Sequence, residues 1–184
     1  MSTRESPLES AAAKLRTAFD ASFSAERAPS AGAALDFLAI RVAGHGYALR
    51  LAEVLAVHAE RELVRVPSPA PSLLGLIGVR GLVVPIYDLR LLLGYAAGPP
   101  PRWLCLARAA SPLGFAFEAF EAHLRLPLES VVAGSELAGN GQRFGRGNVR
   151  TDAGPRTLLH LPSLIASVAN KPHLDRERAR EERR

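Results

Sequence analysis

The residues best suited to chemistry in this sequence are five histidines and one cysteine. No two histidines have the i, i+4 spacing of a zinc-binding helix, and no carboxylate accompanies them in a known metal-ligand pattern. Cys105 lies in the apolar run WLCLA without a basic neighbour that would activate its thiol, so we expect it to be buried and inert. His160 stands between leucines and is expected to be a core or edge residue. The sequence therefore predicts no metal, no cofactor and no nucleophilic catalyst.

The glycine-rich stretches do not predict a nucleotide site. GNGQRFGRG, residues 139–147, does not open a helix after a strand, and no GxxxxGK[ST] loop that would cradle phosphates occurs. A Gly-x-Ser-x-Gly nucleophile elbow is also missing. We therefore expect a protein that is not an enzyme.

The net charge of +5 raises nucleic-acid binding as a possible function. Most arginines, however, stand singly between apolar or acidic neighbours, and the C-terminal run DRERAREERR mixes acids with arginines. Aromatic residues interleaved with basic ones, which a nucleic-acid platform would use, are missing. Nucleic-acid binding is therefore kept only as an alternative.

Short strands must position any site in this chain. From Leu35 onward, apolar runs such as DFLAIRVAG, HGYALRL and LVVPIYDL alternate with turns rich in glycine and proline. This pattern favours an all-β sandwich or barrel. Pro85 lacks an amide donor, so we expect its strand to be an edge strand or to bulge there.

The chain divides by composition into three parts. Residues 1–34 predict an amphipathic helix, because Ser6, Pro7 and Glu9 form a helix start and an apolar stripe follows at spacings of three and four. Residues 35–170 form the β domain, and 171–184 form a charged tail. No stretch reaches the length of a membrane span and no signal peptide is evident, so we expect a cytoplasmic protein.

An internal repeat divides the β domain. GYALRLAEVL at 46–55 matches GFAFEAFEAH at 114–123, and LVVPIYDL at 82–89 matches TLLHLPSL at 157–164. Two matches in the same order predict two related halves, about 35–95 and 100–170, with strand exchange expected between them. Each half is marginal alone, so we expect the halves to pack together and to leave a groove.

Arg80 stands between apolar residues and glycine at the entry to a hydrophobic strand. A guanidinium that stays charged while its stem packs on apolar surface suits the lip of a docking groove, and Gly81 lets another backbone come close. The alternative is that Arg80 pairs internally with Asp88 or Glu53. We expect Asp88 itself to cap a short helix that begins near Leu89.

The stretch GLIGVRGLVVPIYDLRLLLG, residues 75–94, resembles the signature of the CheW family of bacterial chemotaxis coupling proteins. The resemblance extends from about Leu35 to Val168. It implies two packed five-stranded SH3-like β-barrels, here with an N-terminal amphipathic helix and short helices after the barrels. The implied activity is non-catalytic: the protein would couple transmembrane chemoreceptors to a CheA-type histidine kinase.

The resemblance also implies partners and site residues. Arg80, Gly75 and Val54 match positions in the family's receptor-facing groove, and we add Gly81 to this set. The implied partners are the helical cytoplasmic tip of a chemoreceptor, a methyl-accepting chemotaxis protein, and the regulatory domain of the kinase, itself of the same fold. The protein would lie in the cytoplasm, at receptor arrays on the inner membrane, without inserting into it.

Two positions depart from the family pattern. Gly78 replaces the usual asparagine before Val79, and Ala56 stands where an acidic residue is common. The N-terminal extension is also longer than the family core requires. These departures leave the expected fold unchanged, but a lost acid changes charge matching with a partner. An SH3-like-barrel module that binds nucleic acid through its arginines stays open as the alternative function.

Overall fold

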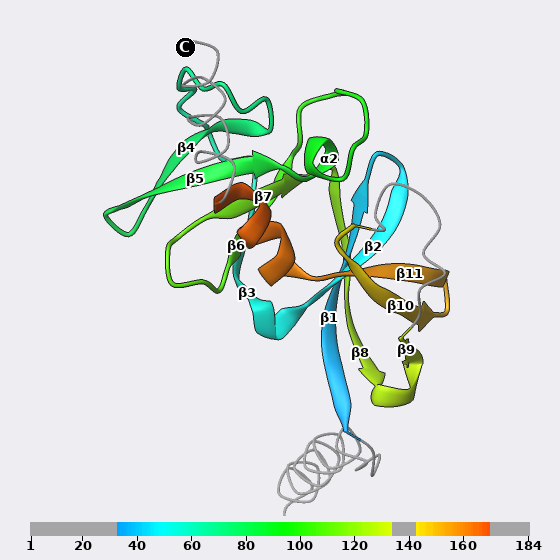
Figure 1. Cartoon of the computed structure of the whole chain (residues 1–184). Helices are drawn as coiled ribbons and strands as arrows, with labels where there is room; N and C mark the ends of the chain where they lie inside the picture. The colour runs from blue at the N-terminus through cyan, green and yellow to red at the C-terminus, as the bar shows by residue number, and fades with distance from the viewer. Residues whose placement is uncertain (1–32, 134–142, 170–184) are drawn as a thin grey trace, which may run out of the picture. The chain divides into compact units, whose positions relative to one another are not determined.

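The structure, a computed structural model, describes residues 33–133 and 143–169. The helix expected near the N-terminus and the charged tail at 171–184 lie outside the described residues. No helix within the described ranges is both long and apolar enough to cross a membrane. The elements, in chain order (Figure 1), are β1 (Ala34–Val42), β2 (His45–Arg50), the 3-10 helix η1 (Leu51–Glu53), β3 (Val54–Ala59), β4 (Leu73–Val79), β5 (Leu82–Asp88), α2 (Leu89–Leu92), β6 (Trp103–Ala107), β7 (Gly114–Phe117), β8 (Ala119–Pro127), the 3-10 helix η2 (Leu128–Ser130), β9 (Val131–Val132), β10 (Gly145–Thr151) and β11 (Gly154–Leu159). Helical residues 161–169 follow β11.

The strands form two sheets. Sheet A has the order β8-β1-β2-β11-β10-β9, and sheet B has the order β3-β6-β7-β5-β4. Sheet A therefore joins the first two strands of the chain to the last four, while sheet B holds the strands between them. The prediction of a mostly β fold with few short helices is confirmed. The pairings among the described residues leave both sheets open, and sheet A has six strands instead of the five expected.

The two sequence matches occupy corresponding places in the sheets. The two copies of the first match begin in β2 and β7, and each of these strands pairs antiparallel with the strand before it, β1 and β6. Each also pairs parallel with a strand of the second match: β2 with β11, and β7 with β5. The two halves therefore exchange strands: β2 of the first half pairs with β11 of the second, and β7 of the second half pairs with β5 of the first.

The main core lies where the two sheets and the short helices pack together. Alternate side chains on the strands point into it, including Ile40 and Leu49 of sheet A and Phe115 of sheet B, all 0% exposed. Cys105 also belongs to this core, and burial raises the pKa of its thiol to about 12, so the expectation of a buried thiol is confirmed. Two smaller apolar clusters cover the opposite faces of the sheets.

Pro85 lies in the interior strand β5, between β7 and β4, so the expectation of an edge strand is wrong. The register shift of the β4–β5 pair falls between Leu73 and Gly75, so the strand does not bulge at Pro85 either. The physical reason is local. The pairing of β5 with β7 begins only at Ile86, and Leu76, which faces Pro85 on β4, directs both backbone groups away from β5. No ladder hydrogen bond needs a donor at Pro85.

Candidate partner-binding site

Arg80 and Gly81 form the tight turn that joins β4 to β5. Their φ angles are 49° and 80°, and they are flanked by the paired residues Val79 and Leu82. Two consecutive positive φ angles in a two-residue hairpin loop are typical of a type I′ turn. Both turn residues are exposed, and no hydrogen bond or ion pair is made by Arg80 within the described residues. The structure thus places a free guanidinium at the tip of a hairpin.

Neither predicted internal partner contacts Arg80. The Oδ1 of Asp88 accepts a hydrogen bond from the backbone N–H of Arg90 at 2.8 Å, and Asp88 is the N-cap of α2, as predicted. Burial raises the pKa of Asp88, although backbone hydrogen bonds at the helix start oppose the shift. The Oε2 of Glu53 accepts from the backbone N–H of Leu161 at 3.1 Å, at the start of helical residues 161–169. Both carboxylates therefore stabilise helix starts.

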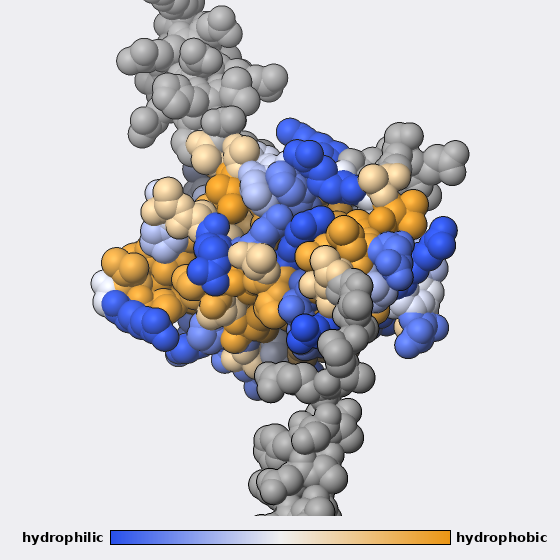
Figure 2. Space-filling model, turned by 90° about the horizontal axis from the view of Figure 1, so that it is seen from below, coloured by the Kyte–Doolittle hydropathy of each residue, from blue (hydrophilic) through white to orange (hydrophobic). Residues whose placement is uncertain are grey.

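Exposed apolar side chains accompany Arg80. Leu82 is 57% exposed and Val83 is 64% exposed, on opposite faces of the ribbon formed by β4 and β5. Val64, which bridges to Leu76 at the outer edge of β4, is 66% exposed. Figure 2 shows apolar surface on the left, the side to which this hairpin projects in Figure 1. Exposed apolar side chains therefore accompany the guanidinium on both faces of the hairpin.

Sequence reasoning missed Val64 and Val83 as surface residues. The exposure of Val64 could have been predicted from the run RELVRV. Charged residues surround Val64 there, and the run lacks the regular alternation of apolar and polar residues that marks a strand with one buried face. Val83 carries no such signal, because its exposure follows from the projection of the hairpin beyond β7, whose pairing with β5 begins at Ile86.

The other two predicted groove residues do not lie on this surface. Gly75 is buried in β4, where a Cβ would lie 2.5 Å from the carbonyl oxygen of Val64. Val54 is 5% exposed and belongs to the main core; it starts β3, at the opposite end of sheet B from β4. The structure therefore brings Arg80 and Gly81 together and keeps Gly75 and Val54 inside the fold.

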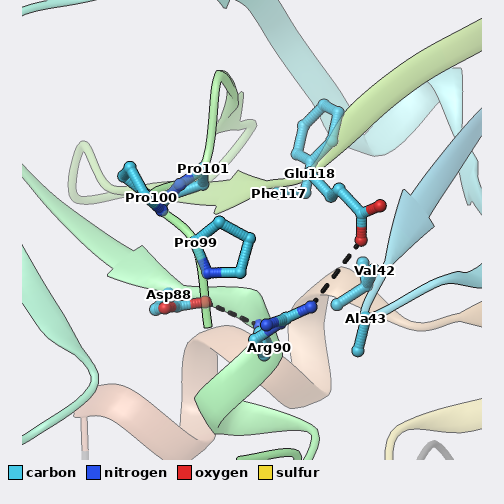
Figure 3. A pocket seen from close by; sticks show the side chains of 9 residues that line it. All are labelled: Val42, Ala43, Asp88, Arg90, Pro99, Pro100, Pro101, Phe117 and Glu118. Atoms are coloured by element: carbon cyan, nitrogen blue, oxygen red, sulfur yellow. Dashed lines mark hydrogen bonds and ion pairs between the residues drawn. The ribbon is translucent and has the colours of Figure 1, made fainter. Parts of the chain in front are cut away.

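Two hollows lie elsewhere on the described surface. One, of about 20 Å³, is lined by Asp88, Arg90, Glu118, the Pro99–Pro101 loop and their neighbours (Figure 3). A guanidinium nitrogen of Arg90 lies 3.8 Å from Glu118 beside it, and the space fits one water molecule. The other, of about 340 Å³, lies between residues 34–36 and 50–52. Neither contains Arg80, so a groove with Arg80 at its lip stays a prediction.

Titratable groups do not gather into a metal or catalytic cluster in the described ranges. No group of three His, Cys, Asp or Glu residues there could hold a metal ion. His58, on β3, has a buried Nε2 without a hydrogen-bond partner. Burial lowers the pKa of its imidazole, and the nearby charge of Arg61 lowers it further.

The fold and its projecting apolar hairpin define a β-rich interaction domain. Residues 36–169 match the CheW-like domain family, and the chain belongs to that family. It is therefore a CheW-like scaffold domain of chemotaxis signalling, from a family that is typically non-catalytic.

A solved structure with a similar fold is the scaffolding protein TtCheW from Thermoanaerobacter tengcongensis. The TM-score is 0.64 at 16% sequence identity, over 70% of this chain and 90% of that chain. No curated protein sequence matches the chain significantly.

Proposed function

We propose that this protein is a non-catalytic scaffold that couples transmembrane chemoreceptors to a CheA-type histidine kinase. It would act in the cytoplasm, at receptor arrays on the inner membrane. The proposal rests on family membership over residues 36–169 and on the exposed guanidinium of Arg80, which has no ion pair within residues 33–133 and 143–169.

The position of Arg80 is the observation that carries the receptor role. The receptor tip implied by the family resemblance is helical, so the contact would place a helix against the hairpin. The rigid guanidinium donates several hydrogen bonds to carboxylates or carbonyls, while Leu82 and Val83 offer apolar contact beside it. Arginine anchors of this kind are frequent hot spots at interfaces.

Gly81 and Gly75 would serve this surface in different ways, whereas Val54 would contribute to the fold alone. Gly81 would allow close approach at the turn. Gly75 would act indirectly, because it lets the chain near Val64 pack against β4 and so holds the base of the hairpin. Val54 would anchor β3 in the core.

We further infer that each sheet is one of the family's SH3-like barrels. In sheet A, the end strand β8 continues through η2 into β9, which pairs at the other end of the sheet. In sheet B, the end strand β3 is followed by Val64, which bridges to β4 at the other end. In both sheets the chain itself passes from one open edge to the other, as closure of a barrel requires.

The receptor role is tested by co-sedimentation with receptor-containing membranes, with and without the kinase. We expect Arg80→Ala to weaken binding by about tenfold or more, the loss typical of an arginine hot spot. Arg125→Ala removes another exposed guanidinium, on β8, and is the matched control, which should bind like the wild type. Equal sedimentation of the Arg80→Ala variant and the wild type would contradict the proposal.

A further inference from the structure

The outer edge of β4 is only partly used. At Leu76, the backbone N–H donates to the carbonyl of Val64 and the carbonyl accepts from the N–H of Val64, both at 2.9 Å. This bridge is isolated, so the neighbouring residues of the chain do not continue the pairing. Backbone groups two residues apart in a strand point the same way. The N–H and C=O of Gly78 therefore point outward along the same edge as those of Leu76.

β5 does not use these groups of Gly78. Val79 and Leu82 flank the two-residue turn and form the hydrogen-bonded pair that closes it. The next pair, Gly78 with Val83, is then a non-hydrogen-bonded pair of the ladder. Within the described residues, no other group bonds to the backbone of Gly78. Because Gly78 is exposed, it presents a free donor and a free acceptor at the surface.

The surroundings of Gly78 favour an approaching backbone. A Cβ built on Gly78 would meet no atom within 4 Å among the described residues. Val83, directly opposite in register, is 64% exposed. Arg80 follows two residues later, exposed and without an acidic partner in the described ranges. One edge thus combines free backbone groups, an apolar neighbour and an unneutralised cation.

We propose that the edge of β4 at Gly78 binds an extended strand of a partner protein, which adds to sheet B antiparallel to β4. A helix cannot satisfy the backbone of Gly78, since a helix uses its own N–H and C=O groups internally. The added strand carries an apolar residue over Val83 and an acidic residue toward Arg80. It runs antiparallel because Val64 already pairs with this edge in that direction. This site goes beyond the proposed receptor contact.

The positive charge of the chain argues against a second copy of this protein as the partner that binds the β4 edge. Each copy carries a net charge of +5, and pairing two β4 edges would bring two hairpins with exposed Arg80 turns together. Like charges at such an interface repel, whereas an acidic strand gains from the same field.

Two substitutions at Gly78 separate the backbone from the side chain. Gly78→Pro removes the outward N–H but no bond of the β4–β5 ladder, so the hairpin should fold. Gly78→Ala keeps the N–H and adds a methyl group into open space, so it is the matched control. Thermal melting and the amide spectrum of the core report whether each variant is folded.

The probe is a capped ten-residue peptide that alternates valine and threonine and ends in two glutamates, titrated into isotope-labelled full-length protein by NMR. We expect the Gly78 amide to shift and its solvent exchange to slow. Gly78→Pro should bind about fivefold or more weakly, and Gly78→Ala within about twofold of the wild type. A peptide of the same composition in which both glutamates are replaced by lysines should bind more weakly, most clearly at low salt.

Three outcomes would overturn the proposal. The first is a Gly78 amide that does not respond to millimolar peptide. The second is a Gly78→Pro variant that is folded and binds as well as the wild type. The third is a shift of Gly78 with protein concentration alone, which would assign the edge to a second copy. None of these measurements involves the receptor or the kinase, so their failure is separate from failure of the proposed function.

Discussion

Gly75 and Gly147 occupy equivalent positions in the two sheets. A Cβ on Gly75 would lie 2.5 Å from the carbonyl oxygen of Val64, and a Cβ on Gly147 would lie 2.3 Å from the carbonyl oxygen of Val132. Their φ angles are +153° and +129°, and each lies in a strand whose register shifts at that point. In each sheet, a glycine lets a short segment of chain, around Val64 in sheet B and β9 in sheet A, pack closely against the strand that contains the glycine.

Alanine at either glycine should therefore destabilise the fold. We expect Gly75→Ala and Gly147→Ala each to lower the free energy of unfolding by about 2–4 kcal/mol, because backbone must move to make room for the methyl group. Urea unfolding followed by circular dichroism measures the change. Gly78→Ala, on the same strand as Gly75 but with open space around its Cβ, should cost less than about 1 kcal/mol. Equal stability of Gly75→Ala and Gly78→Ala would contradict the close-approach argument.

Replacing Arg80 should make the fold more stable and receptor binding weaker. A type I′ turn favours asparagine at its first central position, and arginine at a φ of 49° is strained there. We expect Arg80→Asn to raise the free energy of unfolding by about 0.5–1 kcal/mol while it weakens receptor binding. Urea titration and co-sedimentation of the same preparation measure both effects. If Arg80→Asn binds the receptor as well as the wild type, the proposed role of Arg80 in binding is wrong.

His58 should make the fold sensitive to mild acid. Its pKa is lowered in the folded protein by burial and by Arg61, from an ordinary value of 6.5. The unfolded chain therefore takes up the proton at higher pH than the folded one. The stability from neutral His58 is fully present above about pH 6.5 and is lost as the pH falls toward the folded pKa.

His58→Leu is the variant that checks this dependence. Urea midpoints measured at intervals between about pH 5 and pH 8 should fall toward low pH for the wild type, and less steeply for His58→Leu. An identical slope in both proteins would show that other groups set the dependence.

Cys105 should report on unfolding. Its side chain is 0% exposed, and burial raises the pKa of the thiol to about 12. At pH 8 a thiol reagent should therefore react only after the protein opens, and the reaction should accelerate with urea in parallel with loss of secondary structure. Labelling of the native protein at the rate of a free thiol would contradict the buried position.

What the sequence predicts well in this protein is local. Asp88 caps α2 because its carboxylate reaches an N–H only two residues away, and the residue types Asp-Leu-Arg already indicate it. The alternation of apolar residues predicts the strands, and the repeat at 46–55 and 114–123 begins in β2 and β7 and runs on into the next elements, η1 and β3 in one copy and β8 in the other.

What the sequence does not predict depends on contacts between distant segments. Gly75 was assigned to a groove, but its burial depends on where Val64 crosses β4. Val54 was assigned to the same groove, but its side chain packs in a core shared by both sheets. Pro85 was assigned to an edge, because a single sequence does not show that β7 begins to pair only one residue later. In each case the residue type is compatible with the predicted position, in a groove or at an edge, and with the observed position inside the fold.

The composition of sheet A affects how the chain acquires its structure. β1 and β2 are made first, yet their neighbours in the sheet are β8 and β11. During synthesis these early strands leave the ribosome with both flanks unpaired, and they stay so until almost the whole domain has emerged. Sheet A is therefore expected to form only after β11 has emerged from the ribosome. A nascent chain stalled before β8 should remain open to proteases and chaperones, and a fragment that ends after β7 should not form a stable sheet A.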